Sequence, residues 1–431
     1  MSFSKRQLLK LSALAAAAAP WSGLVRADSG SDMPAMPAAN ALDGLQDITG
    51  GIEKITVQER LARIAKAQRL MRQFKIDALV IEPGSAMLYF TGISWWRSER
   101  LTAVIIPRDG DIAIVTPFFE EPSVRESMSF GDDVRTWHEH ENPFALIAGI
   151  LKDRGIRNGR IGVEATVRYF VVQGLQQAVS GMAITGAESI TRGCRMMKSA
   201  AEIALMKKAN EITLAAYGHV YRQLAIGMTP ADVNGLMSSA QAKLGGKGIW
   251  TMALFGEASA YPHGSNKPHV IEEGQIVLMD CGCSVEGYQS DISRTFVFGE
   301  PSTEQKKIWN LVRQGQSIAF ETAKLGQHAG VVDDAVRRFY EQEGFGPNYA
   351  LPGLSHRTGH GIGMDGHEPV NFVKGEQTQL SPGMCFSNEP GIYLPGKFGV
   401  RLEDCIYMTN KGPAWFTEPP ESLEKPLGKL A

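Results

Sequence analysis

The sequence has few cysteines and no excess of either charge, and both features exclude classes of protein. Five cysteines in 431 residues are too few for a disulfide scaffold, and Cys281 and Cys283, which fit no zinc-cysteine spacing, are expected to pack as small apolar residues. The 44 basic and 46 acidic residues leave a net charge of −2, which gives no electrostatic footprint for nucleic acid. With 43% hydrophobic and 21% charged residues, the chain has the composition of a globular protein of two or three domains.

Residues 1–27 are predicted to be an export signal. A basic stretch at residues 4–10 precedes an apolar stretch at residues 11–19 that is too short to span a membrane, and a small-residue cleavage site ends at Ala27. The basic stretch resembles a twin-arginine signal with Lys5 in place of the first arginine, so the choice between the twin-arginine and general export routes stays open. An amphipathic helix is the alternative, and the scarcity of polar residues disfavours it.

Export predicts a periplasmic or secreted protein. Removal of the signal, which has four basic residues and no acidic one, would shift the net charge from −2 to about −6. Residues 28–54 begin with a stretch rich in Ser, Gly, Ala and Pro and are predicted to be a flexible leader. No other segment approaches membrane length, so no contact with a membrane is expected.

Residues 55–195 are predicted to form an α/β domain. Apolar residues near helical spacing predict one helix from residue 57 and another at 144–152. Short apolar runs at 78–81, 103–106, 112–115 and 160–163 alternate with them and predict strands. The apolar positions of the first helix are Leu61, Ile64, Met71 and Phe74.

Residues 196–431 are predicted to form a second domain, with the boundary near residues 190–198. A capping box from Ser199 to Glu202 opens a long helix, and Thr229 followed by Pro230 opens the next. Further helices are expected at 305–323 and 331–343. The expected buried face of the long helix consists of Ile203, Met206, Ile212 and Val220.

Two carboxylates are expected to face each other across a hairpin at residues 277–296. A turn centred between Val285 and Glu286 would make Asp280 and Asp291 direct cross-strand neighbours, with Cβ atoms about 4.5–5.5 Å apart. Because like charges at this distance destabilise a sheet, a positive group is expected between them.

A second hairpin repeats this arrangement. A turn centred on Gly396 would place Glu389 opposite Glu403. Either carboxylate pair alone is equally compatible with a solvated strand face. Because buried charge is costly unless it is paired or binds a metal, the two pairs together, within mostly apolar strands, favour a metal site.

Histidines support this interpretation, because most of the nine lie between residues 263 and 367. His360 is flanked by glycines, so backbone can approach a ligand closely there. Oxygen-rich ligation with one imidazole suits two divalent ions, Mn²⁺ ahead of Zn²⁺ or Co²⁺. Two such ions lower the pKa of a bridging water and bind a carbonyl oxygen, which is the chemistry of hydrolysis.

These residues lie in motifs that resemble the pita-bread metallopeptidases, the superfamily of methionine aminopeptidase, prolidase, aminopeptidase P and creatinase. The motifs are LMDCG, SDISRTF, GHGIG, NEPGIY and VRLED, in this order, and the similarity spans about residues 55–415. It implies an α/β creatinase-like N-terminal domain and an α+β pita-bread catalytic domain. Matched motif by motif, the implied metal ligands are Asp280, Asp291, His360, Glu389 and Glu403.

The resemblance also implies roles for neighbouring residues. His263 and His367 match histidines that contact the substrate, and His356 matches one that lines the substrate pocket. Tyr393 and Arg401 match a relay that orients the ligands in proline-specific members, so the chain is similar to Xaa-Pro peptidases.

The implied reaction is hydrolysis of short peptides at the bond before a proline in second position. A hydroxide that bridges the metals would attack the carbonyl carbon, and the metals and His367 would stabilise the oxyanion. Glu389 would carry a proton to the leaving nitrogen, while Tyr393, Arg401 and His263 complete the implied catalytic set.

The segment from Trp95 to Arg100 has two interpretations. By resemblance, Trp95 and Arg100 would bind substrate in the active site of a neighbouring subunit, within a homodimer or homotetramer. A surface loop with two half-buried tryptophans explains the same residues equally well.

Two rival functions remain. One is a hydrolase or lyase of the same fold that acts on a small non-peptide substrate, and the other is a binding module that has lost its metal. The complete set of five ligands argues against both. The preference between dipeptides and longer peptides stays open.

Overall fold

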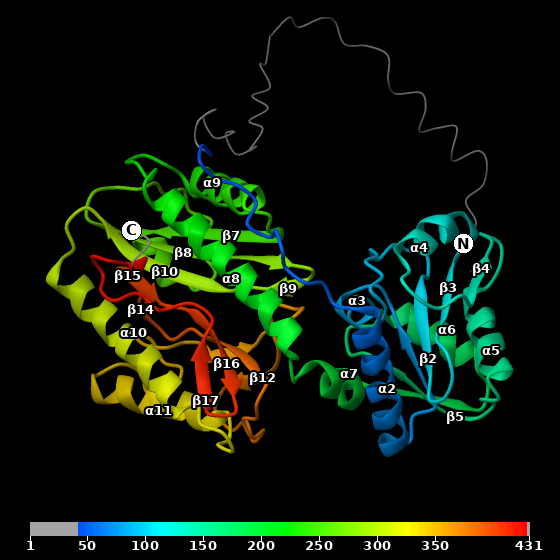
Figure 1. Cartoon of the computed structure of the whole chain (residues 1–431). Helices are drawn as coiled ribbons and strands as arrows, with labels where there is room; N and C mark the ends of the chain where they lie inside the picture. Colours follow the sequence, from blue (N-terminus) through cyan, green and yellow to red (C-terminus); the bar gives the residue numbers. More distant parts are fainter. Residues whose placement is uncertain (1–41, 429–431) are drawn as a thin grey trace, which may run out of the picture. The chain divides into compact units, whose positions relative to one another are not determined.

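Figure 1 shows the computed structural model, which describes residues 42–428. These residues belong to one compact unit. Among them, no helix combines the length and the apolar character that crossing a bilayer requires. The predicted export signal lies outside the described residues.

The flexible leader predicted at 28–54 is wrong for its described part. Leu45, Ile48 and Ile52 pack against the main hydrophobic cluster, and the Ile48 N–H donates to the Leu244 carbonyl over 3.1 Å. The segment is rich in small and polar residues overall, so its composition does not indicate that these three apolar residues contact the core.

The first part of the structure is a mixed six-stranded sheet covered by helices (Figure 1). Its strand order is β4-β3-β2-β1-β5-β6, with parallel pairing of β3 to β4, β1 to β5 and β5 to β6 and antiparallel pairing elsewhere. The predicted α/β class is confirmed. The elements are α2 (Val57–Phe74), β1 (Ala78–Ile81), α3 (Ser85–Thr91), β2 (Ala103–Pro107), β3 (Ala113–Pro117), η1 (Phe118–Glu120), α4 (Glu121–Ser127), β4 (Val134–Trp137), α5 (Pro143–Asp153), β5 (Gly159–Val163), α6 (Tyr169–Ala178), β6 (Met182–Gly186) and α7 (Glu188–Arg195).

Successive residues of the central strands enter two different cores, because side chains alternate across a sheet. Leu79 and Ile81 of β1 pack in the cluster that contains α2, whereas Ala78 and Val80 pack in the cluster beneath α5 and α6. A sheet buried on both faces explains why these strands read as continuous apolar runs.

Helix α2 buries only some of its apolar positions. Ile64 and Met71 are buried, but Leu61 and Phe74 are 47% and 39% exposed. Ala67 and Arg63 are buried as well, because the helix turns the side that carries them toward the sheet and toward the second half of the chain.

The second part begins with two capped helices that cover a sheet. Both predicted capping signals are present: Ser199 and Thr229 accept from the backbone N–H groups three residues later. Helices α8 and α9 cover the sheet β10-β8-β7, to which β9 adds by pairing with β8 (Figure 1). The elements are α8 (Ala200–Tyr221), α9 (Pro230–Lys243), β7 (Lys247–Phe255), η2 (Gly256–Ala260), β8 (Gln275–Val285), β9 (Tyr288–Gln289) and β10 (Ile292–Phe298).

A second sheet, with the order β12-β11-β13-β16-β17, and the hairpin β14–β15 complete the α+β half. Helices α10 and α11 pack against each other and against this sheet and hairpin (Figure 1). The elements are α10 (Thr303–Thr322), α11 (Gly330–Gln342), β11 (Gly359–Gly361), β12 (Glu368–Phe372), β13 (Cys385–Asn388), β14 (Gly391–Leu394), β15 (Phe398–Arg401), β16 (Asp404–Thr409) and β17 (Gly412–Trp415).

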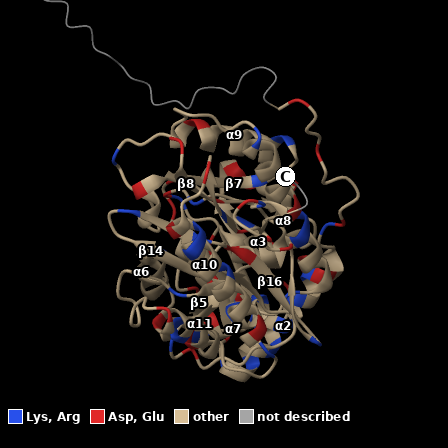
Figure 2. Ribbon diagram, turned by 90° about the vertical axis from the view of Figure 1, so that its left-hand side faces the viewer, with Lys and Arg blue, Asp and Glu red and all other residues tan. Residues whose placement is uncertain are grey.

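The charges of the described residues are distributed without separation by sign. In the view of Figure 2, basic and acidic residues are interspersed along the ribbon rather than gathered in one band. This distribution agrees with the nearly balanced charge of the sequence.

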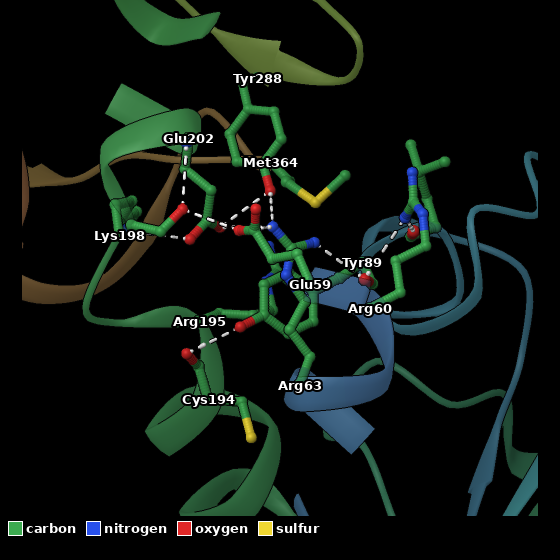
Figure 3. Close-up of polar contacts among 12 residues, drawn as sticks. Glu59, Arg60, Arg63, Tyr89, Cys194, Arg195, Lys198, Glu202, Tyr288 and Met364 are labelled. Carbon is green, nitrogen blue, oxygen red and sulfur yellow. Dashed lines mark hydrogen bonds and ion pairs between the residues drawn. The ribbon is translucent and has the colours of Figure 1, made fainter. Parts of the chain in front are cut away.

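Polar side chains join the two halves of the chain (Figure 3). The Arg63 guanidinium of α2 donates to the Tyr288 hydroxyl over 3.0 Å, and that hydroxyl donates to Glu202 of α8 over 2.8 Å. Farther along, Arg195 at the end of α7 and Lys198 both pair with Glu368. Since Glu368 follows His367 directly, this ion cluster fixes the segment that carries His367.

We expect the pair formed by Glu368 to contribute stability only above acidic pH. Burial alone raises the pKa of Glu368, but Lys198 and Arg195 outweigh burial and lower its pKa to about 2. The contribution is therefore complete above the usual pKa of 4.5 and is lost as the pH falls toward 2. Glu368→Gln should lower the free energy of unfolding at pH 7 by about 3 kcal/mol and flatten its decline between pH 5 and 3, measured by urea unfolding.

Glu421→Gln is the matched control, since its ion pair with Lys425 is exposed. Parallel pH profiles for wild type and Glu368→Gln would contradict this assignment.

Candidate metal centre and active site

The five predicted metal ligands converge in the second half of the chain. Oxygen or nitrogen atoms of Asp280, Asp291 and Glu403 lie within 4.8 Å of one another, as do those of His360, Glu389 and Glu403. A third such group joins His367 to Asp291 and His360. All of these residues line a cavity of about 760 Å³. The structure therefore brings together residues that span more than a hundred positions of sequence.

The first hairpin has a different register from the predicted one. Asp280 pairs with Ser293 rather than with Asp291, and Val285 pairs with Tyr288. The turn is centred between Glu286 and Gly287, whose φ angles of 51° and 86° are both left-handed. Two left-handed residues form the tight turn that matches the twist of a hairpin.

The two carboxylates nevertheless meet. The register differs from the predicted one by two residues, and a shift by two keeps every side chain on its face of the sheet, unlike a shift by one. Asp291, which directly precedes β10, thus lies diagonally across from Asp280.

The second hairpin has the predicted register. Gly391 pairs with Arg401 around the turn at Gly396, and the same alignment continues where Asn388 pairs with Asp404. Glu389 and Glu403 occupy the gap between these two ladders, outside any strand. Their backbones are free of strand pairing, so both carboxylates can turn toward the cavity.

His360 presents one ring nitrogen to the carboxylates. Its Nδ1 lies 3.0 Å from the Gly361 carbonyl, so Nδ1 carries the proton and donates there. Its Nε2 lies 3.3 Å from Glu389 Oε1 and 3.6 Å from Asp291 Oδ2. Burial lowers the pKa of His360 to about 3, which keeps the imidazole neutral near pH 7, as a metal ligand must be.

The carboxylates are suited to bind divalent cations, because some of their buried oxygen atoms accept no hydrogen bond from any described residue. Asp280 Oδ1 and Glu403 Oε1 are buried and have no hydrogen-bond partner among the described residues. Burial, and then repulsion from neighbouring carboxylates, raises the pKa values of Asp291 and Glu403 well above their usual range. Buried oxygen ligands that repel one another, beside one neutral imidazole, suit hard or borderline divalent cations.

A chain of hydrogen bonds orients the ligands from one side. The Arg401 guanidinium donates to Asp280 Oδ2 over 2.6 Å and to the Tyr393 hydroxyl over 3.1 Å. The His356 Nδ1 donates to the Arg357 carbonyl over 2.7 Å, so its Nε2 accepts from the Tyr393 hydroxyl over 2.7 Å. The predicted set of Arg401, Tyr393 and His356 is thus one connected relay.

Sequence reasoning missed a second group of orienting residues. Ser293 donates to Glu403 Oε2 over 2.7 Å and accepts from Arg401 Nε over 2.9 Å. Behind them, the fully buried Arg294 pairs with Asp404 over 2.7 Å and donates to the Glu403 carbonyl over 2.9 Å. The alternation along β10 could have revealed Ser293, because it lies two residues after Asp291.

Other predicted residues fall in two places. His263, His356 and His367 line the cavity, together with Arg357 and Trp250, which had not been predicted. Trp95 and Arg100 do not line it: Trp95 lines a second cavity, and Arg100 pairs with Glu139 on the first half of the chain. Their predicted role in a neighbouring subunit stays a prediction. Cys281 and Cys283 are buried free thiols, in agreement with a packing role.

Family models match both halves. Residues 204–410 match the metallopeptidase family M24, and residues 63–197 match the creatinase/prolidase N-terminal domain. A putative dipeptidase, YkvY, of Bacillus subtilis is 31% identical over 84% of this chain and 99% of its own. An Xaa-Pro dipeptidase of Lactobacillus delbrueckii subsp. lactis is 30% identical over 83% of this chain and 97% of its own.

Solved structures show the same architecture. The chain resembles dipeptidase PepE of Mycobacterium ulcerans with a TM-score of 0.79 at 31% identity, covering 86% of this chain and 98% of that one. It resembles a prolidase of Thermococcus sibiricus with a TM-score of 0.78 at 28% identity, covering 85% and 98%. With its converging carboxylates and histidine, its creatinase-like first half and its pita-bread second half, the chain belongs to the metallopeptidase family M24 and is a peptide hydrolase.

Proposed function

We propose that this protein hydrolyses the bond before proline in short peptides, with about two divalent cations, Mn²⁺ preferred, held by the five predicted ligands. One observation carries the proposal: carboxylate oxygens of Asp280 and Glu403 are buried with no hydrogen-bond partner within residues 42–428, beside the relay of Arg401, Tyr393 and His356. The names of the relatives that act as Xaa-Pro dipeptidases or prolidases support it.

The cations, when bound, would polarise the scissile carbonyl and lower the pKa of a water molecule. The chain supplies the remaining groups. Glu389 keeps 14% of its side chain exposed to the cavity, so its carboxylate can take a proton from the attacking water and pass it to the leaving nitrogen. Burial lowers the pKa of His367, so its neutral imidazole can donate one N–H to the developing oxyanion.

Arg401 holds Asp280 in place through its ion pair, and Ser293 holds Glu403. Both ligands therefore keep their orientation before a cation arrives, which limits the reorganisation that binding requires.

The proposal is tested by incubating the Mn²⁺-loaded protein with Ala-Pro and with Ala-Pro-Ala and measuring the released proline and Pro-Ala, respectively, by chromatography. We expect cleavage at the bond before proline in at least one of the two. A folded, metal-loaded protein that leaves both peptides intact would contradict the proposal and favour a small non-peptide substrate.

We also propose export, on the basis of the basic stretch, the short apolar stretch and the cleavage site at residues 1–27. Expression in a bacterial host followed by fractionation and N-terminal sequencing should yield a periplasmic or secreted form that begins near Asp28. A cytoplasmic protein that still begins at Met1 would contradict export.

A further inference from the structure

A second cavity, of about 710 Å³, lies between the two halves of the chain. The first half contributes the start of α3, the loop at 95–97, the loop after β5 and helix α7; the second half contributes residues 365–369. His367 lines this cavity as well as the metal cavity, so the two cavities adjoin at this residue. None of the catalytic or metal-binding roles proposed above takes place in this second cavity.

Most charged groups around the cavity already have partners. Arg195 pairs with Asp365 and Glu368, and Arg97 donates to the Pro83 and Thr166 carbonyls. These side chains build the walls and are not free to bind a ligand.

Three charged side chains that line the cavity have no such partner among residues 42–428: Glu188, which is exposed, and two half-buried residues of opposite sign, Glu164 and Arg192. The Glu164 carboxylate, after β5, and the Arg192 guanidinium, on α7, form no hydrogen bond or ion pair with any residue from 42 to 428, and no ion pair joins them to each other. Both are half-buried. Burial raises the pKa of Glu164, because it removes water that would solvate the carboxylate. An unpaired, partly desolvated charge is costly, and here two of them face the same cavity.

The rest of the lining is partly apolar. Trp95 stacks on Trp96 with ring centroids 4.6 Å apart, which fixes its orientation beside the cavity. Ala86, Ala165 and Met196 add further apolar surface. A ligand that matches this lining has an apolar group in addition to its charges.

We propose that this cavity binds a free amino acid with an apolar side chain. Its ammonium group would pair with Glu164, its carboxylate with Arg192, and its side chain would lie against Trp95. A simple cation or a simple anion would satisfy only one of the two half-buried unpaired groups, whereas a zwitterion satisfies both, and the exposed Glu188 stays solvated. The binding site lies outside the metal centre and does not depend on the proposed peptidase activity.

The test is binding of radiolabelled L-leucine to the Mn²⁺-loaded full chain, measured by equilibrium dialysis. Leucine can also bind the metal centre through its amine, so the informative quantity is the difference between wild type and variant. We expect wild type to bind about one leucine per chain more than Glu164→Gln or Arg192→Gln. Leucinamide and N-acetylleucine, which each lack one charge, should show at most a tenth of the affinity that leucine shows for this additional site.

Glu126→Gln and Arg157→Gln are matched controls, because both residues are exposed on the same half of the chain and line neither cavity. They should bind leucine as wild type does. Arg192→Lys keeps the charge and should keep the additional site within about tenfold in affinity, which distinguishes a lost contact from a damaged fold.

Equal binding by wild type, Glu164→Gln and Arg192→Gln would overturn the inference, as would an additional site that accepts leucinamide as well as leucine. Cleavage of Ala-Pro by the same preparations is a separate readout. A protein that binds the additional leucine without cleaving the peptide would contradict the proposed function and leave this inference standing.

Discussion

Glu389→Gln should lower kcat for an Xaa-Pro substrate by about a thousandfold, the scale of lost acid–base catalysis. The amide is nearly isosteric with the carboxylate, and its oxygen can still accept the hydrogen bond from Ser387. It cannot accept a proton from the attacking water, and it is a weaker ligand for a divalent cation. The loss should therefore appear in kcat, measured with saturating Mn²⁺ and Ala-Pro.

The folded state should tolerate this substitution. Burial, only partly opposed by Arg401, raises the pKa of Glu389 to about 7, so the charged carboxylate is disfavoured at this position. A neutral amide should leave the free energy of unfolding of the metal-free protein unchanged or higher. Glu304→Gln, at an exposed ion pair with Lys397, is the matched control and should retain wild-type kcat. Activity of Glu389→Gln within threefold of wild type would show that another group moves the proton.

The enzyme should cleave Ala-Pro about a hundredfold faster than Ala-Ala. The nitrogen of an Xaa-Pro bond carries no hydrogen, whereas any other residue brings an N–H that needs an acceptor. The lining of the metal cavity includes the apolar residues Trp250, Met252 and Pro262, and the Nε2 of His356 already accepts from Tyr393. The carboxylate oxygens of the cavity would be occupied by the proposed cations. An N–H left unpaired costs about 1–3 kcal/mol, which at its upper end is about a hundredfold in rate.

This comparison requires the same Mn²⁺-loaded preparation for both dipeptides and kcat/KM as the measured quantity. Equal values would remove the specificity for proline while leaving the fold and the metal centre in place.

Local signals in the sequence predicted many elements of the fold, although α3, α6, β4, β6 and β7 were not predicted. Ser199 and Thr229 each cap a helix through contacts within three residues, so the sequence around them contains the whole motif. The strands of the first half are continuous apolar runs because both faces of their sheet are buried. Burial depends on distant partners instead, and this is why the helical spacing of Leu61 and Phe74 does not reveal that both side chains are exposed.

The candidate site likewise has features that the local sequence predicts and features that depend on distant residues. The Gly396 turn could be placed from its sequence, and with it the facing of Glu389 and Glu403. The other turn could not, because the left-handed conformation of Glu286 is unusual for a residue with a side chain. The pairing of Arg294 with Asp404 joins residues 110 positions apart, and no local pattern reports such a contact.

The most direct test of the account is the number of metal ions per chain. The purified full chain would be stripped with a chelator, reloaded with Mn²⁺, dialysed and analysed for manganese and protein by mass spectrometry. The five ligands around one cavity predict about two Mn²⁺ per chain for wild type and fewer than one for an Asp291→Asn, Glu403→Gln double variant. A wild-type value near zero after reloading would contradict the metal centre and with it the proposed reaction.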